Sequence, residues 1–145
     1  MGYDAGKRTK GVKRHILVDT LGLMLHAVVH PASVQDRDGA GLVLDRRTRR
    51  RFPFLKVVFA DQGYQGPKAA TAVARAGAWT LDIVHRVTAQ KGFTVLPMRW
   101  VVERTLSWLR RNRRLAKDVE HLTRTAEAMI SLAMIKIMLR RLCRS

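Results

Sequence analysis

A short apolar run that ends in a carboxylate constrains the fold of this 145-residue chain more than any other stretch. Residues 57–60 read Val-Val-Phe-Ala, Asp61 follows at once, and a glycine stands two positions later. Four consecutive apolar residues, two of them β-branched, predict a buried strand. Asp61 is then expected at the carboxyl end of that strand, where open α/β sheets hold their functional groups.

The segments after this strand predict that it belongs to a parallel pair. Gly63 and Gly66 indicate a turn, and Pro67 suits the first turn of a helix that the alanine-rich residues 68–76 continue. Residues 79–84, Trp-Thr-Leu-Asp-Ile-Val, predict a second strand. A strand, a crossover helix and a further strand form a βαβ unit, so we expect the two strands to run parallel.

The first third of the chain predicts an antiparallel hairpin and one helix. Residues 14–18 and 23–29 are apolar and flank an Asp/Gly turn, which is typical of a hairpin. Residues 1–13 are rich in Gly and Lys and are expected to be extended or loose. Residues 33–51 predict a single helix that ends in an arginine run before Pro53.

The last third predicts two helices joined by a basic connection. The first covers about residues 98–111 and carries Glu103. The second covers about residues 125–142 and is apolar nearly all round, so we expect it to be buried against the sheet or a partner. Its apolar stretch is interrupted by Lys and Arg and is too short to span a bilayer. The whole chain is expected to form one α/β unit.

Charge points to a polyanionic partner. The chain has 28 Lys and Arg against 11 Asp and Glu, a formal net charge of +17, and nucleic acid is the leading candidate. A general basic structural protein is the alternative, because arginine runs are often solvated faces. The polar first 14 residues do not indicate a secretory signal. Cys143 is the single cysteine, which excludes an internal disulfide and fits a reducing cytosol.

Glu103 lies in a pattern that invites two interpretations. Arg99, Glu103 and Arg110 fall on one stripe of the predicted helix. An ordinary ion pair between residues four apart explains this pattern by itself. In a strongly basic chain, however, Glu103 and the strand-end Asp61 together predict a site for Mg²⁺, which prefers carboxylate oxygens. Two such ions roughly 4 Å apart activate water and stabilise the leaving oxygen in phosphodiester cleavage.

Eight segments in a fixed order carry a resemblance that covers nearly the whole chain. They are residues 2–7 (GYDAGK), 11–15 (GVKRH), 18–22 (VDTLG), 31–38 (PASVQDRD), 59–64 (FADQGY), 99–105 (RWVVERT), 111–117 (RNRRLAK) and 126–130 (AEAMI). Together they resemble the catalytic portion of bacterial insertion-sequence transposases of the IS4/IS5 type, which belong to the DDE class. The ordered set is far more specific than any one of the motifs.

The resemblance implies a fold, a reaction and a set of site residues. The fold is an RNase H-like mixed sheet flanked by helices over residues 1–145, and the reaction is metal-dependent cleavage and transfer of DNA strands. Three acids bind two divalent ions, Mg²⁺ or Mn²⁺; Asp61 is the second acid and Glu103 the third. Arg99 matches the arginine four residues before the glutamate, and Arg110 stands where a lysine is usual. Leu96 replaces a tyrosine of the family's pattern.

The cations expected to hold DNA come from two parts of the chain. They are Lys7, Lys10, Lys13, Arg14, Arg111, Arg113 and Arg114. The expected partners are the insertion-sequence ends and target DNA, with an oligomer forming on the DNA and no membrane contact. The resemblance implies a bacterial cytoplasmic protein associated with the nucleoid.

The family's first acid lies on a central strand before the segment that residues 2–7 match, so we expect the fold to lack that strand. Asp4 lies in a loose basic stretch, Asp19 in a turn, and Asp36 and Asp38 at a helix start, so none is expected to replace it. The polypeptide alone is therefore expected to be inactive.

The missing strand has two possible sources: an upstream reading frame joined by frameshifting, or a polypeptide such as full-length transposase acting in trans. The third possibility is that nothing supplies it. The alternative function is that of a non-catalytic DNA-binding or regulatory transposase fragment.

Overall fold

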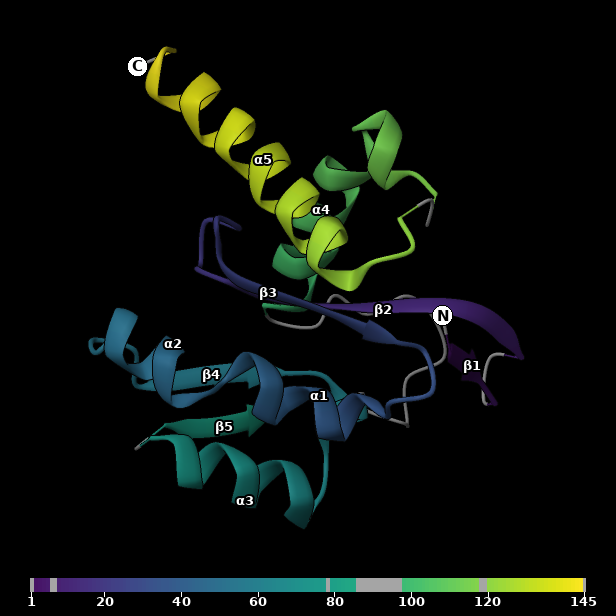
Figure 1. Cartoon of the computed structure of the whole chain (residues 1–145). Coiled ribbons are helices and arrows are strands. Elements are labelled where there is room, and N and C mark those ends of the chain that lie inside the picture. The colour runs from purple at the N-terminus through teal and green to yellow at the C-terminus, as the bar shows by residue number, and fades with distance from the viewer. Residues whose placement is uncertain (1, 6–7, 78, 86–97, 118–119, 145) are drawn as a thin grey trace, which may run out of the picture. The chain divides into compact units, whose positions relative to one another are not determined.

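The computed structural model describes residues 2–5, 8–77, 79–85, 98–117 and 120–144 (Figure 1). The chain divides into two compact units: unit 1 comprises residues 1–34 and 101–145, and unit 2 comprises residues 35–100. Each unit combines strands with helices, which confirms the mixed α/β class. Within the described residues, no helix has the length and apolar character needed to cross a membrane.

Unit 1 contains a three-stranded antiparallel sheet in the order β1-β2-β3. Strands β2 (Thr9–Val18) and β3 (Met24–Pro31) form the predicted hairpin. The Asp19 carboxylate closes the turn, because its Oδ1 accepts hydrogen bonds from two backbone N–H groups, those of residues 21 and 23, each at 2.9 Å. Of the two alternatives predicted for residues 1–13, extended or loose, the described residues show extended backbone, since β1 (Gly2–Asp4) pairs with the first part of β2. Backbone pairing of this kind leaves no apolar pattern in the sequence.

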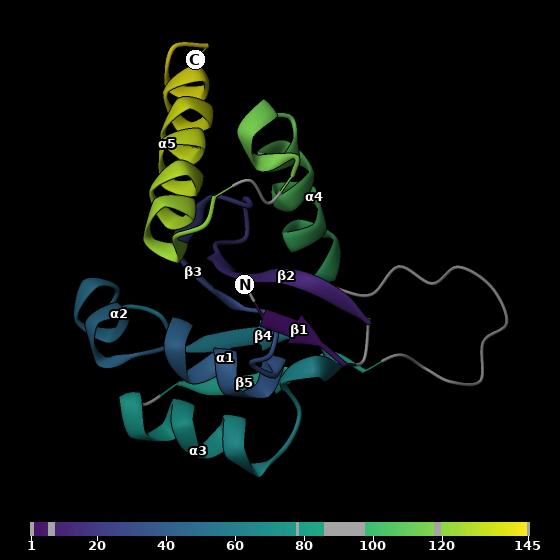
Figure 2. The ribbon, with the colours of Figure 1, turned by 45° about the vertical axis from the view of Figure 1, so that its right-hand side comes forward.

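Helices α4 (Arg99–Arg110) and α5 (Thr123–Leu142) lie on the same side of the hairpin (Figures 1 and 2). Between the helices and the sheet lies the core of unit 1, to which the short helix η2 (Arg113–Leu115) also contributes. The buried core residues are Val29, Leu109, Leu115, Ala126, Ile130, Ala133 and Met134. This core positions α4, the helix that carries Glu103.

Helix α5 packs against β3 of the sheet, as its apolar composition predicts, and it buries one face. Ile130 is 1% exposed, whereas Leu132 and Leu139 on another face are 59% and 55% exposed. The other face stays exposed because unit 1 offers α5 one sheet face and the adjoining connection to pack against. An apolar composition does not by itself supply a second partner.

Trp108 of α4 contributes a further contact between the two helices. Two guanidinium groups lie over its ring, that of Arg104 at 4.8 Å from the ring centroid and that of Arg141 at 4.6 Å. A cation over the face of an indole is attracted by the ring quadrupole. Trp108 therefore ties the end of α5 to α4.

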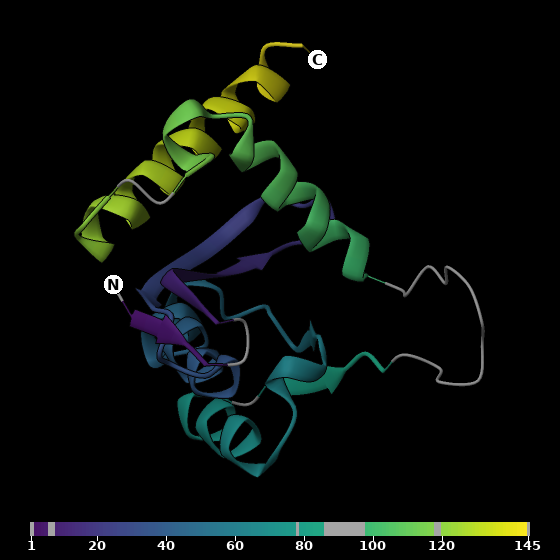
Figure 3. The same ribbon diagram turned by 90° about the vertical axis from the view of Figure 1, so that its right-hand side faces the viewer.

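Unit 2 contains the predicted βαβ unit. Strands β4 (Val57–Ala60) and β5 (Thr80–Ile83) are parallel, and α3 (Pro67–Ala76) connects them. Helix α1 (Asp36–Val43) packs against α3 (Figure 3). The prediction that the strand before Asp61 is buried was wrong: Val57 and Phe59 are 48% and 47% exposed. A two-stranded sheet has little width with which to cover alternate side chains.

The single helix predicted over residues 33–51 is two helices in the structure. Helix α1 ends at Val43, and α2 (Arg46–Arg51) begins after Asp45. Asp45 has an extended backbone, and its carboxylate accepts a hydrogen bond from Thr48 N at 2.8 Å, so it caps α2. The Thr48 hydroxyl donates to Val43 O at 2.9 Å, which satisfies a carbonyl at the end of α1. The hydrogen bonds of these two side chains stabilise the break between α1 and α2 more than a continuous helix would stabilise the same segment.

Candidate functional site

Asp61 lies where the sequence predicts it, directly after β4. Its side chain is exposed, and its Oδ1 accepts a hydrogen bond from Gly63 N at 3.0 Å. This bond begins the short helix η1 (Gln62–Tyr64). The carboxylate is therefore held at the strand end by the backbone of the loop that follows it.

A second carboxylate, from Asp36, approaches the same loop. Asp36 is the first residue of α1, which packs against η1. A Cβ placed on Gly63 would lie 3.1 Å from Asp61 Oδ1 and 3.2 Å from Asp36 Oδ2. The two oxygens are thus separated by at most the sum of these distances. Gly63 therefore lies beside both carboxylates, and a side chain at this position would crowd them.

The Tyr64 side chain lies in the electrostatic field of both acids, which affects its pKa. Its phenol is largely buried, and burial is the main cause that raises its pKa above the ordinary value of 10.0. The negative charges of Asp36 and Asp61 raise that pKa further. The phenol is therefore protonated and neutral at physiological pH. One loop of unit 2 thus gathers two carboxylates and a phenol.

The donors at this loop fit a divalent cation. Carboxylate oxygens are the ligands that Mg²⁺ and Mn²⁺ prefer. Among the described residues, no group of three or more His, Cys, Asp or Glu side chains lies close enough to hold a metal ion. The pair of aspartates is therefore a partial ligand set.

Glu103 lies in unit 1, exposed on α4, and Arg110 lies exposed in the last turn of the same helix. Arg99 is the first residue of α4, and its side chain lies outside the described residues, as does Leu96. Because Asp61 and Glu103 belong to different units, the pairing of the two acids stays a prediction.

The two residues after Glu103 anchor its helix to the hairpin turn. Arg104 donates to Leu21 O at 2.8 Å, and the Thr105 hydroxyl donates to Gly22 O at 2.7 Å. These bonds fix the height and rotation of α4 over the β2–β3 turn. The sequence alone does not indicate this role for Arg104 or Thr105. It shows that Gly22 belongs to a turn, but it does not show that α4 contacts this turn.

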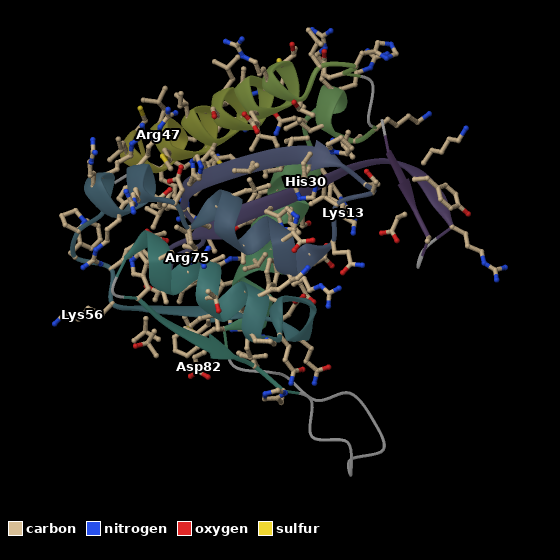
Figure 4. The ribbon with its side chains drawn as sticks, turned by 60° about the horizontal axis from the view of Figure 1, so that its bottom comes forward. Lys13, His30, Arg47, Lys56, Arg75 and Asp82 are labelled. Atoms are coloured by element: carbon tan, nitrogen blue, oxygen red, sulfur yellow. The ribbon has the colours of Figure 1, made fainter. Side chains whose placement is uncertain are left out.

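The residues predicted to contact DNA fall into two groups. Lys10, Arg111, Arg113 and Arg114 are exposed. Lys13 and Arg14 are half-buried and bind within unit 1: Lys13 Nζ lies 3.2 Å from Asp4 Oδ2, and Arg14 donates to Leu115 O at 3.0 Å. Lys13 lies opposite His30 of β3 in the hairpin (Figure 4). Lys7 lies outside the described residues.

The charged surface and the acidic loop are typical of proteins that act on nucleic acid through divalent ions. A family model, the transposase DDE domain, matches residues 1–138. The chain therefore belongs to the transposase DDE domain family. This confirms the resemblance on which the sequence interpretation depends.

One curated relative has a comparable sequence. It is a protein of Burkholderia cepacia named "Putative transposase for insertion sequence element IS402", which is 32% identical over 111 residues. The match covers 72% of this chain and 52% of the relative, so the chain spans about half the length of that protein. No solved structure matches the chain significantly.

Proposed function

We propose that the chain is the catalytic portion of an insertion-sequence transposase that cleaves and joins DNA strands with divalent metal. The observation that carries this proposal is Asp61, held at the carboxyl end of β4 beside a second carboxylate, in a chain of the transposase DDE domain family. Strand ends of open α/β sheets are where functional groups gather. The two units would together form one RNase H-like catalytic domain over residues 1–145.

Asp61 and Glu103 are the proposed metal ligands. A bound Mg²⁺ or Mn²⁺ would activate water and stabilise the leaving oxygen of a phosphodiester. Arg99 and Arg110, on the helix that carries Glu103, would contact phosphate or orient Glu103. Arg104 and Thr105 would hold that helix in place through the hairpin turn.

DNA at the insertion-sequence ends and at the target would bind chiefly through phosphate contacts. Lys10, Arg111, Arg113 and Arg114 are exposed and available for this role. The arginines of α2, four of which are exposed, add a second basic segment. Binding of this kind weakens steeply as salt rises, because each neutralised phosphate releases counterions. An oligomer assembled on DNA is the proposed working form.

We further propose that the 145-residue polypeptide is inactive, or nearly so, when it is tested by itself. Asp61 and Glu103 account for two of the three acids that two-ion chemistry of this class requires. The third would be supplied by a segment joined to this one or provided in trans.

The test is strand transfer on DNA that carries the insertion-sequence ends, with Mg²⁺ and with the longer transposase that contains these residues. Asp61→Asn and Glu103→Gln should each lower the rate by more than about a hundredfold, because loss of a ligand exceeds the cost of losing an outer-shell partner. Asp38→Asn removes an exposed acid of α1 and should leave the rate unchanged. Full activity in Asp61→Asn would refute the assignment, and robust strand transfer by the 145-residue polypeptide alone would refute its proposed inactivity.

A second candidate function is a non-catalytic DNA-binding or regulatory fragment, which the net charge of +17 favours. Such a fragment would bind DNA or full-length transposase and block transposition. Its salt-sensitive DNA binding should survive both Asp61→Asn and Glu103→Gln unchanged. Inhibition of full-length transposase by either variant, at the wild-type concentration, would favour this function over catalysis.

A further inference from the structure

We infer that Phe54 and the cations around it form a site for single-stranded DNA, in which an unpaired base stacks on the phenyl ring. The site lies in unit 2, in the segment that joins α2 to β4. Lys56 precedes β4 and Asp61 follows it, so the site and the proposed metal ligand lie at opposite ends of that strand. The inference rests on the proposed action of the chain on DNA and adds a contact surface to it.

A turn that several contacts hold presents Phe54 to solvent. The side chain is 69% exposed, more than any other Phe, Tyr or Trp that the structure describes. Leu55 N donates to Phe52 O at 3.3 Å, which closes a turn with Pro53 and Phe54 at its centre. Proline has a fixed φ that suits this position of a turn. Arg49 donates to Leu55 O at 2.7 Å and thereby ties the turn to α2.

The Phe52 ring supports the ring of Phe54. The two rings meet edge to face, with 6.1 Å between their centroids and 82° between their planes, a favourable arrangement for aromatic pairs. Phe52 itself is half-buried. A base that stacks on Phe54 therefore meets a ring that is already oriented, and binding loses little side-chain freedom.

The surroundings of Phe54 are strongly basic. Residues 46–56 include six Lys and Arg and no Asp or Glu. Five of these cations are exposed: Arg46, Arg47, Arg50, Arg51 and Lys56. Lys56 points away from the ribbon (Figure 4). Like charges four residues apart on a helix repel each other, as those of Arg46 and Arg50 do, and the phosphates of a bound strand would offset this repulsion.

The combination of an exposed ring and flanking cations favours a single strand over a duplex. In a duplex each base is covered on both faces by its neighbours, so a surface ring finds a base to stack on only where the strand is unpaired. Arg51 precedes Phe54 and Lys56 follows it, so phosphates on both sides of the stacked base have a cation nearby. Aromatic rings that stack on bases, in a basic surface that follows the backbone, bind single strands without reading their sequence.

The experiment is a titration of the 145-residue protein into fluorescein-labelled oligothymidine of about 12 nucleotides, followed by fluorescence anisotropy at fixed salt. Phe54→Ala should weaken binding by about tenfold, because it removes one stack between a base and an aromatic ring. Phe54→Trp should keep the wild-type affinity, whereas Phe54→Leu, which is apolar but has no π face, should bind as weakly as Phe54→Ala. Leu132→Ala, at an exposed apolar residue of unit 1, is the control and should leave the affinity unchanged.

Three other nucleic acids separate stacking from phosphate contact. An abasic oligonucleotide of the same length keeps the phosphates, and the wild type should bind it about as weakly as Phe54→Ala binds oligothymidine. A duplex of the same length should bind wild type and Phe54→Ala equally, and a loss of duplex binding as large as that of oligothymidine would contradict a single-strand site. Tighter binding of oligouridine than of oligothymidine would contradict the assignment to DNA.

The salt dependence of binding tests the cations. Arg51→Gln and Lys56→Gln should each lower the slope of log affinity against log salt by about 0.7, because each removes one phosphate contact to a single strand. Lys136→Gln removes the same charge from an exposed site of α5 and should leave the slope unchanged. Equal slopes in all three variants would show that net charge, and not position, determines binding, which would overturn the role of these cations.

Equal affinity of wild type and Phe54→Ala for oligothymidine would overturn the inference, as would equal affinity of the wild type for oligothymidine and the abasic strand. Far-UV circular dichroism establishes that the variants are folded. If Phe54→Ala does not fold, the comparison of Phe54→Leu with Phe54→Trp decides in its place, and equal affinities of these two variants would refute stacking.

The two proposals fail in different ways. If Phe54→Ala keeps the wild-type affinity for oligothymidine while Asp61→Asn abolishes strand transfer by the longer transposase, the inference about Phe54 is wrong and the proposed function stands. If Phe54→Ala weakens binding while Asp61→Asn leaves strand transfer intact, the single-strand site is present and the proposed catalytic role of Asp61 is wrong.

Discussion

Thr105 offers the sharpest test of how the helix that carries Glu103 is held. Its side chain is 0% exposed, and its hydroxyl donates to Gly22 O at 2.7 Å and also lies 3.1 Å from Val101 O. Thr105→Val removes the hydroxyl and keeps the branched shape, so no cavity opens. Val101 O keeps its regular helical partner. Gly22 O loses a buried donor.

The loss of this donor sets the expected change in the free energy of unfolding. A buried carbonyl left without its donor costs about 1–3 kcal/mol, so we expect Thr105→Val to lower the free energy of unfolding by about 2 kcal/mol. The measurement is urea unfolding followed by far-UV circular dichroism, with an unchanged dependence on urea concentration. Ser107→Ala, on an exposed site of the same helix, is the control and should change stability by less than about 0.5 kcal/mol.

Two outcomes would contradict the proposed role of the Thr105 hydroxyl. If Thr105→Val unfolds within about 0.5 kcal/mol of wild type, the hydroxyl does not anchor α4 to the hairpin turn. A large loss that also changes the dependence on urea would mean that the substitution alters the unfolded or native ensemble, and the argument from one hydrogen bond would not apply.

Three other substitutions test the core, a helix cap and the buried phenol. Ile130→Ala should cost about 2–5 kcal/mol in chemical denaturation, whereas Leu132→Ala, on the exposed face of α5, should cost less than about 0.5 kcal/mol; equal losses would contradict the described core. Asp45→Ala should cost about 1 kcal/mol because α2 loses its cap, and a smaller loss for Asp45→Asn would support capping. Because the pKa of Tyr64 is raised, the folded state keeps a proton that the unfolded state loses above about pH 10. The free energy of unfolding should therefore fall as pH rises above about 10, and it should fall less in Tyr64→Phe. Identical pH profiles of the two proteins would show that the phenol is not buried.

The hairpin, the parallel pair and the position of Asp61 were predictable because each depends on neighbouring residues. Apolar runs of four to eight residues separated by Gly, Asp or Pro specify strands and turns locally. The strand-end position of Asp61 follows from the same pattern. The role of Asp61 with Glu103 stays a prediction, since the two acids lie in different units.

The errors share one physical cause, which is competition from partners distant in sequence or from side-chain caps. The helix predicted over residues 33–51 breaks because Asp45 and Thr48 cap the break. Apolar composition predicted a buried β4, yet Val57 and Phe59 are exposed because burial depends on how much surface the neighbouring elements supply.

The sequence by itself determined the strongly basic charge, the βαβ unit and the family to which the chain belongs, because each is encoded in composition or in contiguous segments. The tertiary structure alone decided that Thr105 and Arg104 bind the hairpin turn 83 residues away in sequence. It alone brought Asp36 to Gly63 and thus to Asp61. The physical reason is that packing of α1 against η1, and of α4 over the hairpin, sets distances between residues whose separation in sequence carries no such information.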